Sequence, residues 1–355
     1  MRSTILTLTA LLAALPAAPI AGPPEKETPV DKAIDKALEF LDNIQDKTDG
    51  AWRAGRGGKT PAVTSLAVMA FLSAGHVPGE GKYGTTVEKG VRWVLRQQQA
   101  NGVIASDDRQ LMYHHGIATL MLAEVAGMTD SDLAGEIRTK LAKAVNVILR
   151  AQRGGNGHQS GGWRYQIAPV QGSDLSVTGW QLLALRAAKN LGCDVPSDTI
   201  DRAVEYIKRC HNRTSGGFGY TSPYDVTIPC TGTGILALEL CGKERHHSPE
   251  ALKAGALLIR EQYLPRWSQP HFFYSIYYGS QATFQLGDNY WSAYKPRLHE
   301  VLLRNQNYNG SWSGGDSDSV YGPAYTTAMG VLALTVEYRF LPIYQRGEEP
   351  ADKEQ

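Results

Sequence analysis

The chain has 355 residues, with 36 lysines and arginines against 35 aspartates and glutamates. This balance provides no general electrostatic attraction for nucleic acid or an anionic membrane, so we expect neither as a partner. Hydrophobic residues make up 42% of the sequence, which excludes a wholly disordered chain and allows a large buried core.

The first segment has the features of a secretory signal. Arg2 precedes an apolar run over residues 5–21 that two prolines interrupt and that ends in small residues. This run is short of the roughly 20 apolar residues of a membrane-spanning helix, so we expect no transmembrane anchor. We predict a signal peptide over residues 1–21, export to the periplasm or outside the cell, and a linker over residues 22–29.

A pair of unlike helices then recurs with a period of roughly fifty residues, which is typical of repeat proteins. The first helix of each pair has apolar residues at helical spacing on one side and charges on the other, which predicts a surface helix with one buried stripe. Six segments have this pattern, at residues 31–45, 86–99, 136–152, 198–210, 248–263 and 294–306.

The second helix of each pair carries few charges and many small and apolar residues, which predicts packing on more than one side. Five of these helices are followed by glycine, and we expect each glycine to end its helix in the left-handed conformation. The six segments are residues 60–75, 112–127, 173–192, 227–242, 271–287 and 321–338, and the five glycines are Gly75, Gly127, Gly192, Gly242 and Gly287.

Six hairpins with a polar outer layer and an apolar inner layer can close into a ring. The sequence therefore predicts one all-α domain over residues 30–345, an α/α toroid (α6/α6 barrel) around a central cavity, with no sheet. We expect residues 346–355 to form a disordered tail.

The connectors carry a family resemblance. Gln306, Gly310 and Trp312 match the Gln-x-x-x-Gly-x-Trp repeat of squalene cyclases, oxidosqualene cyclases and protein prenyltransferase β subunits, with looser copies starting at Gln45 and Gln152. The resemblance implies a toroid of the terpenoid cyclase and protein prenyltransferase superfamily. In such a fold, the tryptophan would pack against the neighbouring hairpin and the glutamine amide would cap a helix end.

The family's catalytic clusters are incomplete in this sequence. Squalene–hopene cyclases use an Asp-x-Asp-Asp-Thr cluster, whereas the matching stretch here has only Asp174 with Ser176 and Thr178. The zinc-binding set of the prenyltransferases has no counterpart, and Asp225 and Cys230 lie five residues apart around a proline. We therefore expect no metal and no cofactor, and Asp174 is the best candidate for a catalytic residue.

The four cysteines admit two interpretations. Cys193, Cys210, Cys230 and Cys241 all lie in the third and fourth hairpins. Cys210 and Cys230 lie at adjoining helix ends and could form a disulfide in an exported protein, or all four could be small buried thiols.

The amino-terminal ends of the inner helices should converge on one mouth of the ring, which is the expected binding site. We predict ligand contacts from His115, Asp174, Thr178, Tyr274, Tyr278 and Tyr325. The mouth should also receive Asp107, Asp108, Tyr113, His114, Ser176, Tyr224, Asp225, His271, Asp316, Asp318 and Tyr321. Each of these residues has an alternative structural role, since Asp174 could cap its helix and a buried histidine is often only hydrogen-bonded.

The fifth inner helix carries a polar aromatic stripe of His271, Tyr274, Tyr278 and Gln281, which could face the cavity or pack against another helix. Two functions remain open at this stage. The first is an exported toroid that binds an apolar, isoprenoid or sugar-like ligand, or a protein partner, without catalysis. The alternative is a divergent enzyme acting on an isoprenoid or a carbohydrate; a glycosidase would need two facing carboxylates, for which Asp174 could pair with Asp225 or Asp316.

Overall fold

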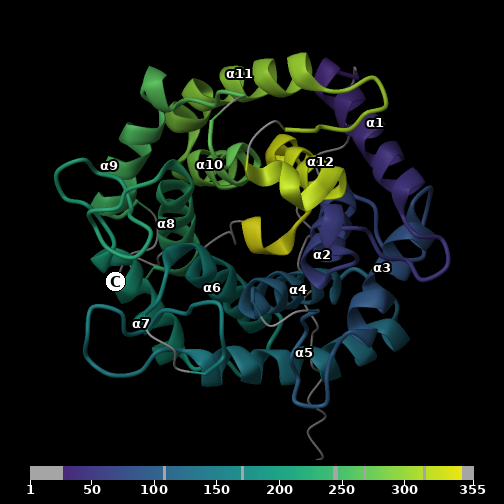
Figure 1. Ribbon diagram of the computed structural model, residues 1–355, viewed down its shortest axis with the longest axis horizontal. Coiled ribbons are helices and arrows are strands. Elements are labelled where there is room, and N and C mark those ends of the chain that lie inside the picture. Colours follow the sequence, from purple (N-terminus) through teal and green to yellow (C-terminus); the bar gives the residue numbers. More distant parts are fainter. Residues whose placement is uncertain are drawn as a thin grey trace, which may run out of the picture.

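The computed structural model describes residues 27–106, 109–168, 172–242, 247–267, 269–314 and 317–345. In this part of the chain, twelve α-helices form two concentric layers and the residues make isolated bridges but no β-strand (Figure 1). The outer helices are α1 (Pro29–Ile44), α3 (Gly84–Arg96), α5 (Ser131–Ala151), α7 (Ser197–Arg209), α9 (Pro249–Leu258) and α11 (Asp288–Asn305). The inner helices are α2 (Pro61–Ser73), α4 (Leu111–Val125), α6 (Leu175–Asn190), α8 (Ile228–Cys241), α10 (Phe272–Leu286) and α12 (Gly322–Leu334). The predicted all-α toroid is confirmed.

The difference in composition between the two helix types produces the two layers. Helix α1 buries one stripe that includes Ile34, Leu38 and Leu41, whereas all 13 residues of α2 are buried. An outer helix therefore meets the core along one face, and an inner helix is covered on every side except where it meets the cavity.

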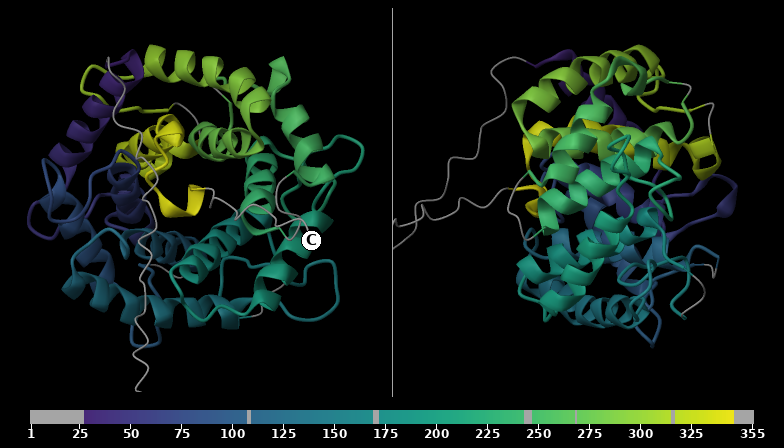
Figure 2. Two further views of the ribbon diagram at one scale, coloured as in Figure 1. Left: turned by 180° about the vertical axis from the view of Figure 1, so that it is seen from behind. Right: turned by 90° about the vertical axis from the view of Figure 1, so that its left-hand side faces the viewer.

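The ring is closed by contacts between the first and last hairpins. Each inner helix contacts the next in chain order, and α12 returns to contact α2. Where the first and last hairpins meet, the Thr335 hydroxyl donates to the Ser73 hydroxyl (2.9 Å) and the Tyr338 hydroxyl bonds Asp31. The view from behind shows the same closed ring (Figure 2, left).

The glutamine and tryptophan of the repeat join each connector to its neighbours, as the resemblance implied. The Gln306 amide donates to the carbonyl oxygens of Gly310 (2.9 Å) and Ala33 (2.7 Å), so the last connector is held to the first helix. The buried Trp312 indole donates to the carbonyl oxygen of Leu302 (2.9 Å). Glycine is required at position 310 because φ is +87° and a Cβ atom would lie 2.1 Å from a backbone oxygen of α1.

The same arrangement recurs around the ring. Gln45 and Gln152 each donate to the glycine carbonyl of their own connector and to a carbonyl of the next outer helix. Gln98 makes the equivalent pair of bonds, in a copy that sequence comparison overlooked because Ile104 replaces the tryptophan.

Two of the five glycines predicted to be left-handed do not have this conformation. Gly75, Gly192 and Gly287 have φ values of +89°, +92° and +100°, as expected. Gly242 has φ −62° because the chain leaves α8 in an extended conformation, and Gly127 is not among the residues with positive φ. The prediction was therefore wrong for these two positions.

The four cysteines are free thiols in this structure. Burial raises the pKa of Cys210 to about 11 and the pKa of both Cys230 and Cys241 to about 12, so these three thiols stay protonated at neutral pH. The interpretation as small buried thiols therefore holds for Cys210, Cys230 and Cys241, whereas Cys193 is half-buried. Among the described helices, none is both long and apolar enough to cross a membrane.

Residues 336–345 cover the end of the ring that lies opposite the amino termini of the inner helices. This segment contains η4 (Val336–Tyr338) and η5 (Pro342–Tyr344), and η5 lies in the middle of the ring in Figure 1. The backbone N–H of Ile343 donates to the Glu124 carboxyl group near the end of α4 (3.1 Å), and the Tyr344 hydroxyl bonds that of Tyr277 (2.6 Å). The ring therefore has one open mouth and one covered end.

Candidate functional site at the mouth of the toroid

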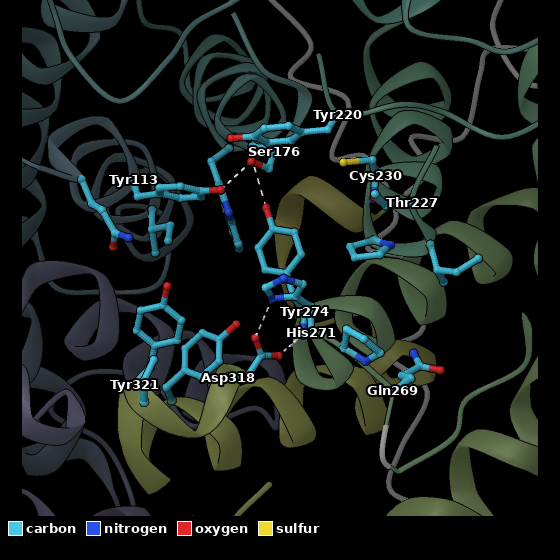
Figure 3. Close-up of a pocket in the computed structure, with 18 of the residues that line it drawn as sticks. Tyr113, Ser176, Tyr220, Thr227, Cys230, Gln269, His271, Tyr274, Asp318 and Tyr321 are labelled. Atoms are coloured by element: carbon cyan, nitrogen blue, oxygen red, sulfur yellow. Dashed lines mark hydrogen bonds and ion pairs between the residues drawn. The ribbon is translucent and has the colours of Figure 1, made fainter. Parts of the chain in front are cut away.

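A cavity of about 1190 Å³ opens where the first turns of the inner helices converge. Its walls combine tyrosine rings, carboxamides and aliphatic side chains. The aromatic and polar groups include Gln110, Tyr113, His114, Tyr165, Ser176, Trp180, Tyr220, Gln262, Gln269, His271, Tyr274, Asp318, Tyr321 and Tyr325, several of which Figure 3 shows around the cavity. Such a volume is large enough for a ligand of several sugar rings or a long hydrocarbon chain.

One repeated position of the inner helices supports the connectors and does not face the cavity. In four hairpins, a threonine hydroxyl at this position accepts the backbone N–H of the connector's aromatic residue, at 3.0–3.2 Å; these threonines are Thr64, Thr178, Thr231 and Thr327. His115 occupies the same position in the second hairpin, where its ring accepts the N–H of Ile104 (3.1 Å) and bonds the carbonyl oxygen of Ala144 (3.0 Å).

The prediction that Thr178 and His115 line the mouth is therefore corrected. Both side chains are fully buried behind the wall, because the repeat uses their position to hold the connector. Burial also lowers the pKa of His115 to about 4, so this imidazole is neutral at physiological pH. The histidine of this helix that lines the cavity is His114, whose ring accepts the backbone N–H of Ser106 (3.3 Å).

Asp174 lies directly behind the cavity wall as the N-cap of α6. One carboxylate oxygen accepts the N–H of Val177 (2.8 Å) and the hydroxyl of Ser176 (2.7 Å), while the other oxygen is buried without a hydrogen-bond partner. Burial raises the pKa of this carboxyl to about 6, against the opposing effect of these two bonds. Asp174 is thus both the cap and a group that titrates near neutral pH.

Two tyrosines of the cavity meet at Ser176. The Tyr113 hydroxyl bonds the Ser176 hydroxyl (2.5 Å), and the Tyr274 hydroxyl donates to the Ser176 carbonyl oxygen (3.3 Å), as the dashed lines in Figure 3 mark. Ser176 itself is 7% exposed and lines the cavity. Asp174 therefore reaches the cavity through a continuous chain of hydroxyl groups.

His271 and Asp318 form a second polar pair at the mouth. The imidazole Nδ1 lies 3.2 Å from one Asp318 oxygen, and the other oxygen accepts the N–H of Tyr274 (3.2 Å), so Asp318 also caps α10 from another segment. The His271 side chain is 60% exposed whereas that of Asp318 is 2% exposed. His271 also has φ +53°, a conformation that is costly for a residue with a side chain and is concentrated at functional sites.

The aromatic stripe of α10 divides between the cavity and the core. Tyr274 lines the cavity, but Tyr278 and Gln281 are buried against neighbouring helices. The Tyr278 ring packs edge-on to Trp180 (5.4 Å between centroids), and Trp180 lies parallel to Tyr277 (5.3 Å) at the cavity floor. The predicted contact between a ligand and Tyr278 would therefore have to be indirect, because Trp180 and Tyr274 form the surface.

The remaining predicted mouth residues differ in their surroundings. Tyr325 lines the cavity and packs on Tyr321 (5.1 Å between centroids), and Tyr224 is 88% exposed. Asp225 also lines the cavity, but its two oxygens accept hydrogen bonds from Thr221 and Ser222 that hold the loop. Burial acts to raise the pKa of Asp225, and these hydrogen bonds together outweigh it and lower the pKa. Asp107, Asp108 and Asp316 lie outside the described residues. In the part of the chain that is described, no group of three or more His, Cys, Asp or Glu side chains is placed to hold a metal ion.

Sequence reasoning overlooked two pairings at this site. Asp318 and His271 lie 47 residues apart, and both were expected at the mouth without being paired. Tyr113 and Ser176 lie 63 residues apart on adjacent inner helices. Only a comparison of the repeats could have indicated that Ser176 faces the cavity. Ser176 lies two residues after the N-cap of its helix, and the residues two after the N-caps of α2 and α8, Ala62 and Pro229, also line the cavity.

The chain is similar in fold to several solved enzymes. An inactive variant of an α-1,6-mannanase from Salegentibacter sp. HEL1_6, solved with α-1,6-mannotriose, superimposes with a TM-score of 0.66 at 11% identity, over 87% of this chain and 99% of that one. A cellobiose 2-epimerase from Bacillus thermoamylovorans B4167 gives 0.65 at 12% identity, over 87% and 99%. A type II terpene cyclase from Scytonema, solved with geranylgeranyl dihydroxybenzoate, gives 0.58 at 16% identity, over 88% and 98%.

At these identities the likeness concerns the toroid alone. No protein-family model matches the sequence, and the comparison with curated proteins gives no match. The resemblance to the terpenoid cyclase and prenyltransferase superfamily thus extends to the fold, which mannanases and epimerases share.

Proposed function

We propose that this protein is an enzyme that carries out acid–base chemistry on a carbohydrate bound at the mouth of the toroid. The observation that carries the proposal is the pair formed by His271 and Asp318. His271 Nδ1 lies 3.2 Å from the buried Asp318 carboxylate, which as an ion can only accept, and 3.1 Å from the Ser317 hydroxyl. Donation from Nδ1 to the carboxylate would fix the tautomer in which Nε2 accepts or returns a proton. This arrangement supports the alternative of a divergent enzyme over binding without catalysis.

The walls of the cavity favour a carbohydrate. Tyrosine rings can stack on the apolar faces of sugar rings while their hydroxyl groups bond sugar hydroxyls. Three carboxamides, of Gln110, Gln262 and Gln269, add donors and acceptors around the same space. The mannanase and the epimerase with similar folds are named for sugar substrates, which agrees with this choice.

An isoprenoid is the second candidate, and one part of the wall favours it. Val63, Leu66 and Ile117 form an aliphatic surface on α2 and α4 without polar groups. A hydrocarbon chain would bury apolar area there, at about 25 cal/mol per Å². The terpene cyclase with a similar fold was solved with an isoprenoid substrate.

The test is turnover by the wild-type protein and by variants of the pair. The protein is incubated with α-1,6-mannotriose, with cellobiose and with geranylgeranyl dihydroxybenzoate, and the products are followed by mass spectrometry and NMR. We expect a sugar product and a loss of about 10²–10⁴ in kcat/KM for His271→Gln and Asp318→Asn. His158→Gln, at an exposed histidine away from the cavity, is the matched control. Full activity in both variants of the pair would overturn the proposal.

We also propose that the enzyme acts after export. The apolar run over residues 5–21 supports a signal peptide over residues 1–21. This segment and the predicted tail over residues 346–355 lie outside the described residues, and α1 begins at Pro29, the last residue of the predicted linker over residues 22–29. Amino-terminal sequencing of the protein recovered from its host would test the cleavage, which we expect between residues 18 and 26.

A further inference from the structure

We propose that Tyr113 is a second proton-transfer residue of the site and that Ser176 connects it to Asp174, which receives the proton. The inference rests on the proposed function and adds the partner group that acid–base chemistry with His271 requires. The three groups are in direct contact, at 2.5 Å between the Tyr113 and Ser176 hydroxyls and 2.7 Å between the Ser176 hydroxyl and Asp174.

The repeat itself shows that Asp174 is more than a cap. The equivalent N-caps of α2 and α8 are Thr60 and Thr227, whose hydroxyls accept the N–H group three residues on, as Asp174 does. A threonine therefore satisfies the helix end in this fold. A carboxylate at the same place brings a charge into the protein interior, where its desolvation is costly, and capping does not explain that cost.

The residue that joins Asp174 to the cavity is also exceptional within the repeat. At the offset of two residues after the cap, α2 has Ala62 and α8 has Pro229, neither of which can pass a proton, whereas α6 has Ser176. The hydroxyl and the carboxylate thus occur together in one hairpin only among these three, opposite a tyrosine from α4. Helix capping predicts no such coincidence.

The hydrogen bonds fix the direction of transfer. Ser176 has one hydroxyl hydrogen and donates it to the Asp174 carboxylate, so Tyr113 must donate its own hydrogen to the Ser176 oxygen. The lone pairs of the Tyr113 oxygen can then accept a proton from a hydroxyl group of the substrate.

The step is balanced by three coupled transfers. The substrate hydroxyl gives its proton to the Tyr113 oxygen, Tyr113 gives its own proton to Ser176, and Ser176 gives its own to Asp174. The negative charge moves from Asp174 to the substrate oxygen, while the two hydroxyl groups end as they began. The reverse sequence returns a proton to the product, and no oxidant or reductant is needed.

The acidities of the two end groups suit these roles. Burial, followed by the charge of Asp174, raises the pKa of Tyr113 well above its ordinary value, so the phenol cannot itself hold the negative charge. Asp174, with a pKa of about 6, is ionised at neutral pH and can still take up a proton. Tyr113 therefore acts as a conductor between the substrate and the carboxylate.

The first test needs no substrate. Infrared titration of the wild-type protein should show a carboxyl that titrates near pH 6 and is absent from Asp174→Thr, the variant that restores the cap of α2 and α8. Ser176→Ala removes the hydroxyl that donates to the carboxylate, and Tyr113→Phe removes the donor to Ser176. Both should move this titration to higher pH, because the ionised form loses hydrogen-bond stabilisation directly or through Ser176. Ser248→Thr, an exchange at the N-cap of α9 in the outer layer, should leave it in place. A titration that is unchanged in both Ser176→Ala and Tyr113→Phe would overturn the relay.

The second test uses the substrate identified with the His271 variants. We expect kcat/KM of the wild-type enzyme to rise with pH through about 6, and the rise to disappear in Asp174→Thr with a loss of about 10²-fold. If His271→Gln is inactive and Asp174→Thr retains the wild-type pH profile, the relay is wrong and the proposed function stands. If the infrared coupling is present but the wild-type protein turns over none of the substrates, the proposed function fails instead.

Discussion

Two buried acids of the inner helix layer have a raised pKa, Asp174 at the mouth and Glu124 at the covered end, and the two have different partners. At the mouth, Asp174 bonds Ser176 and so communicates with the cavity. At the covered end, Glu124 accepts the N–H of Ile343 and so holds the carboxy-terminal segment. Burial raises the pKa of both, to about 6 for Asp174 and to about 8 for Glu124.

The comparison suggests different roles for the two ends of the ring: the mouth serves binding and chemistry, and the opposite end holds the carboxy-terminal segment in place. The hydroxyl groups around Asp174 can pass protons to a ligand, and the exposed rim there carries Tyr224 and Val320, which are 88% and 65% exposed. The groups around Glu124 bond the protein's own chain, where Leu341, Ile343 and Tyr344 are buried. We therefore expect substitutions at the covered end to affect mainly stability, and those at the mouth to affect mainly chemistry.

The largest expected effect is at the covered end. Tyr344→Ala should lower the free energy of unfolding by about 3–5 kcal/mol, the usual cost of removing a large buried ring. Tyr224→Ala at the mouth should change it by less than about 0.5 kcal/mol, because that side chain is 88% exposed. Urea denaturation of both variants measures the difference. Equal effects would mean that the segment around Tyr344 is not part of the cooperative core.

The second prediction concerns Glu124 and the pH dependence of stability. Its pKa of about 8 in the folded protein exceeds the ordinary 4.5, so between these pH values the folded state holds a proton that the unfolded state has lost. Stability must then fall as pH rises through this window, by about 3–4 kcal/mol between about pH 5 and about pH 8.

Glu124→Gln should lack this fall while keeping an oxygen to accept the N–H of Ile343. The measurement is the difference in unfolding free energy between the variant and the wild type across the pH range. A difference that stays constant with pH would show that Glu124 is ionised at neutral pH after all.

Most of the fold could be predicted from the sequence. The periodicity of apolar residues identified the outer helices, and the scarcity of charges identified the inner ones; the predicted inner segments at 60–75 and 227–242 contain α2 and α8 entirely. Closure also followed, because six hairpins suffice for a ring. These features depend on local spacing and composition, which the sequence displays directly.

The site was harder to predict because it depends on which side of each inner helix faces the cavity. Almost every residue of α2 and α4 is buried, whichever side of the helix it lies on, so hydrophobicity does not show which side faces the cavity. His115 was therefore chosen where His114 lines the cavity. His271 and Asp318 belong to neighbouring hairpins, 47 residues apart in the sequence. Their contact depends on how the hairpins pack, which no spacing along the chain shows.

The third prediction applies the same linkage at the mouth. The pKa of Asp174 is about 6 in the folded protein against an ordinary 3.8, so wild-type stability should fall by about 2–3 kcal/mol between about pH 4 and about pH 7. Asp174→Thr should not show this fall and should be the more stable protein at neutral pH, provided that the cap forms as in Thr60. Thermal unfolding at both pH values tests this. A variant less stable than the wild type at neutral pH would show that the carboxylate contributes to folding, and the contrast with Glu124 would then disappear.

The smallest expected effect isolates one hydrogen bond at the covered end. Tyr277→Phe removes the partner of the Tyr344 hydroxyl, 2.6 Å away, while the ring remains stacked on Trp180. We expect a loss of about 1 kcal/mol, the net value of a buried neutral hydrogen bond, at every pH below the titration of the two phenols. Tyr321→Phe at the mouth should cost about 0.5 kcal/mol or less, since its side chain is 36% exposed and water can replace the hydroxyl's contacts. Turnover should be unchanged in Tyr277→Phe, because Tyr277 is buried and does not line the cavity. Lost activity without lost stability would instead connect the covered end to the chemistry at the mouth.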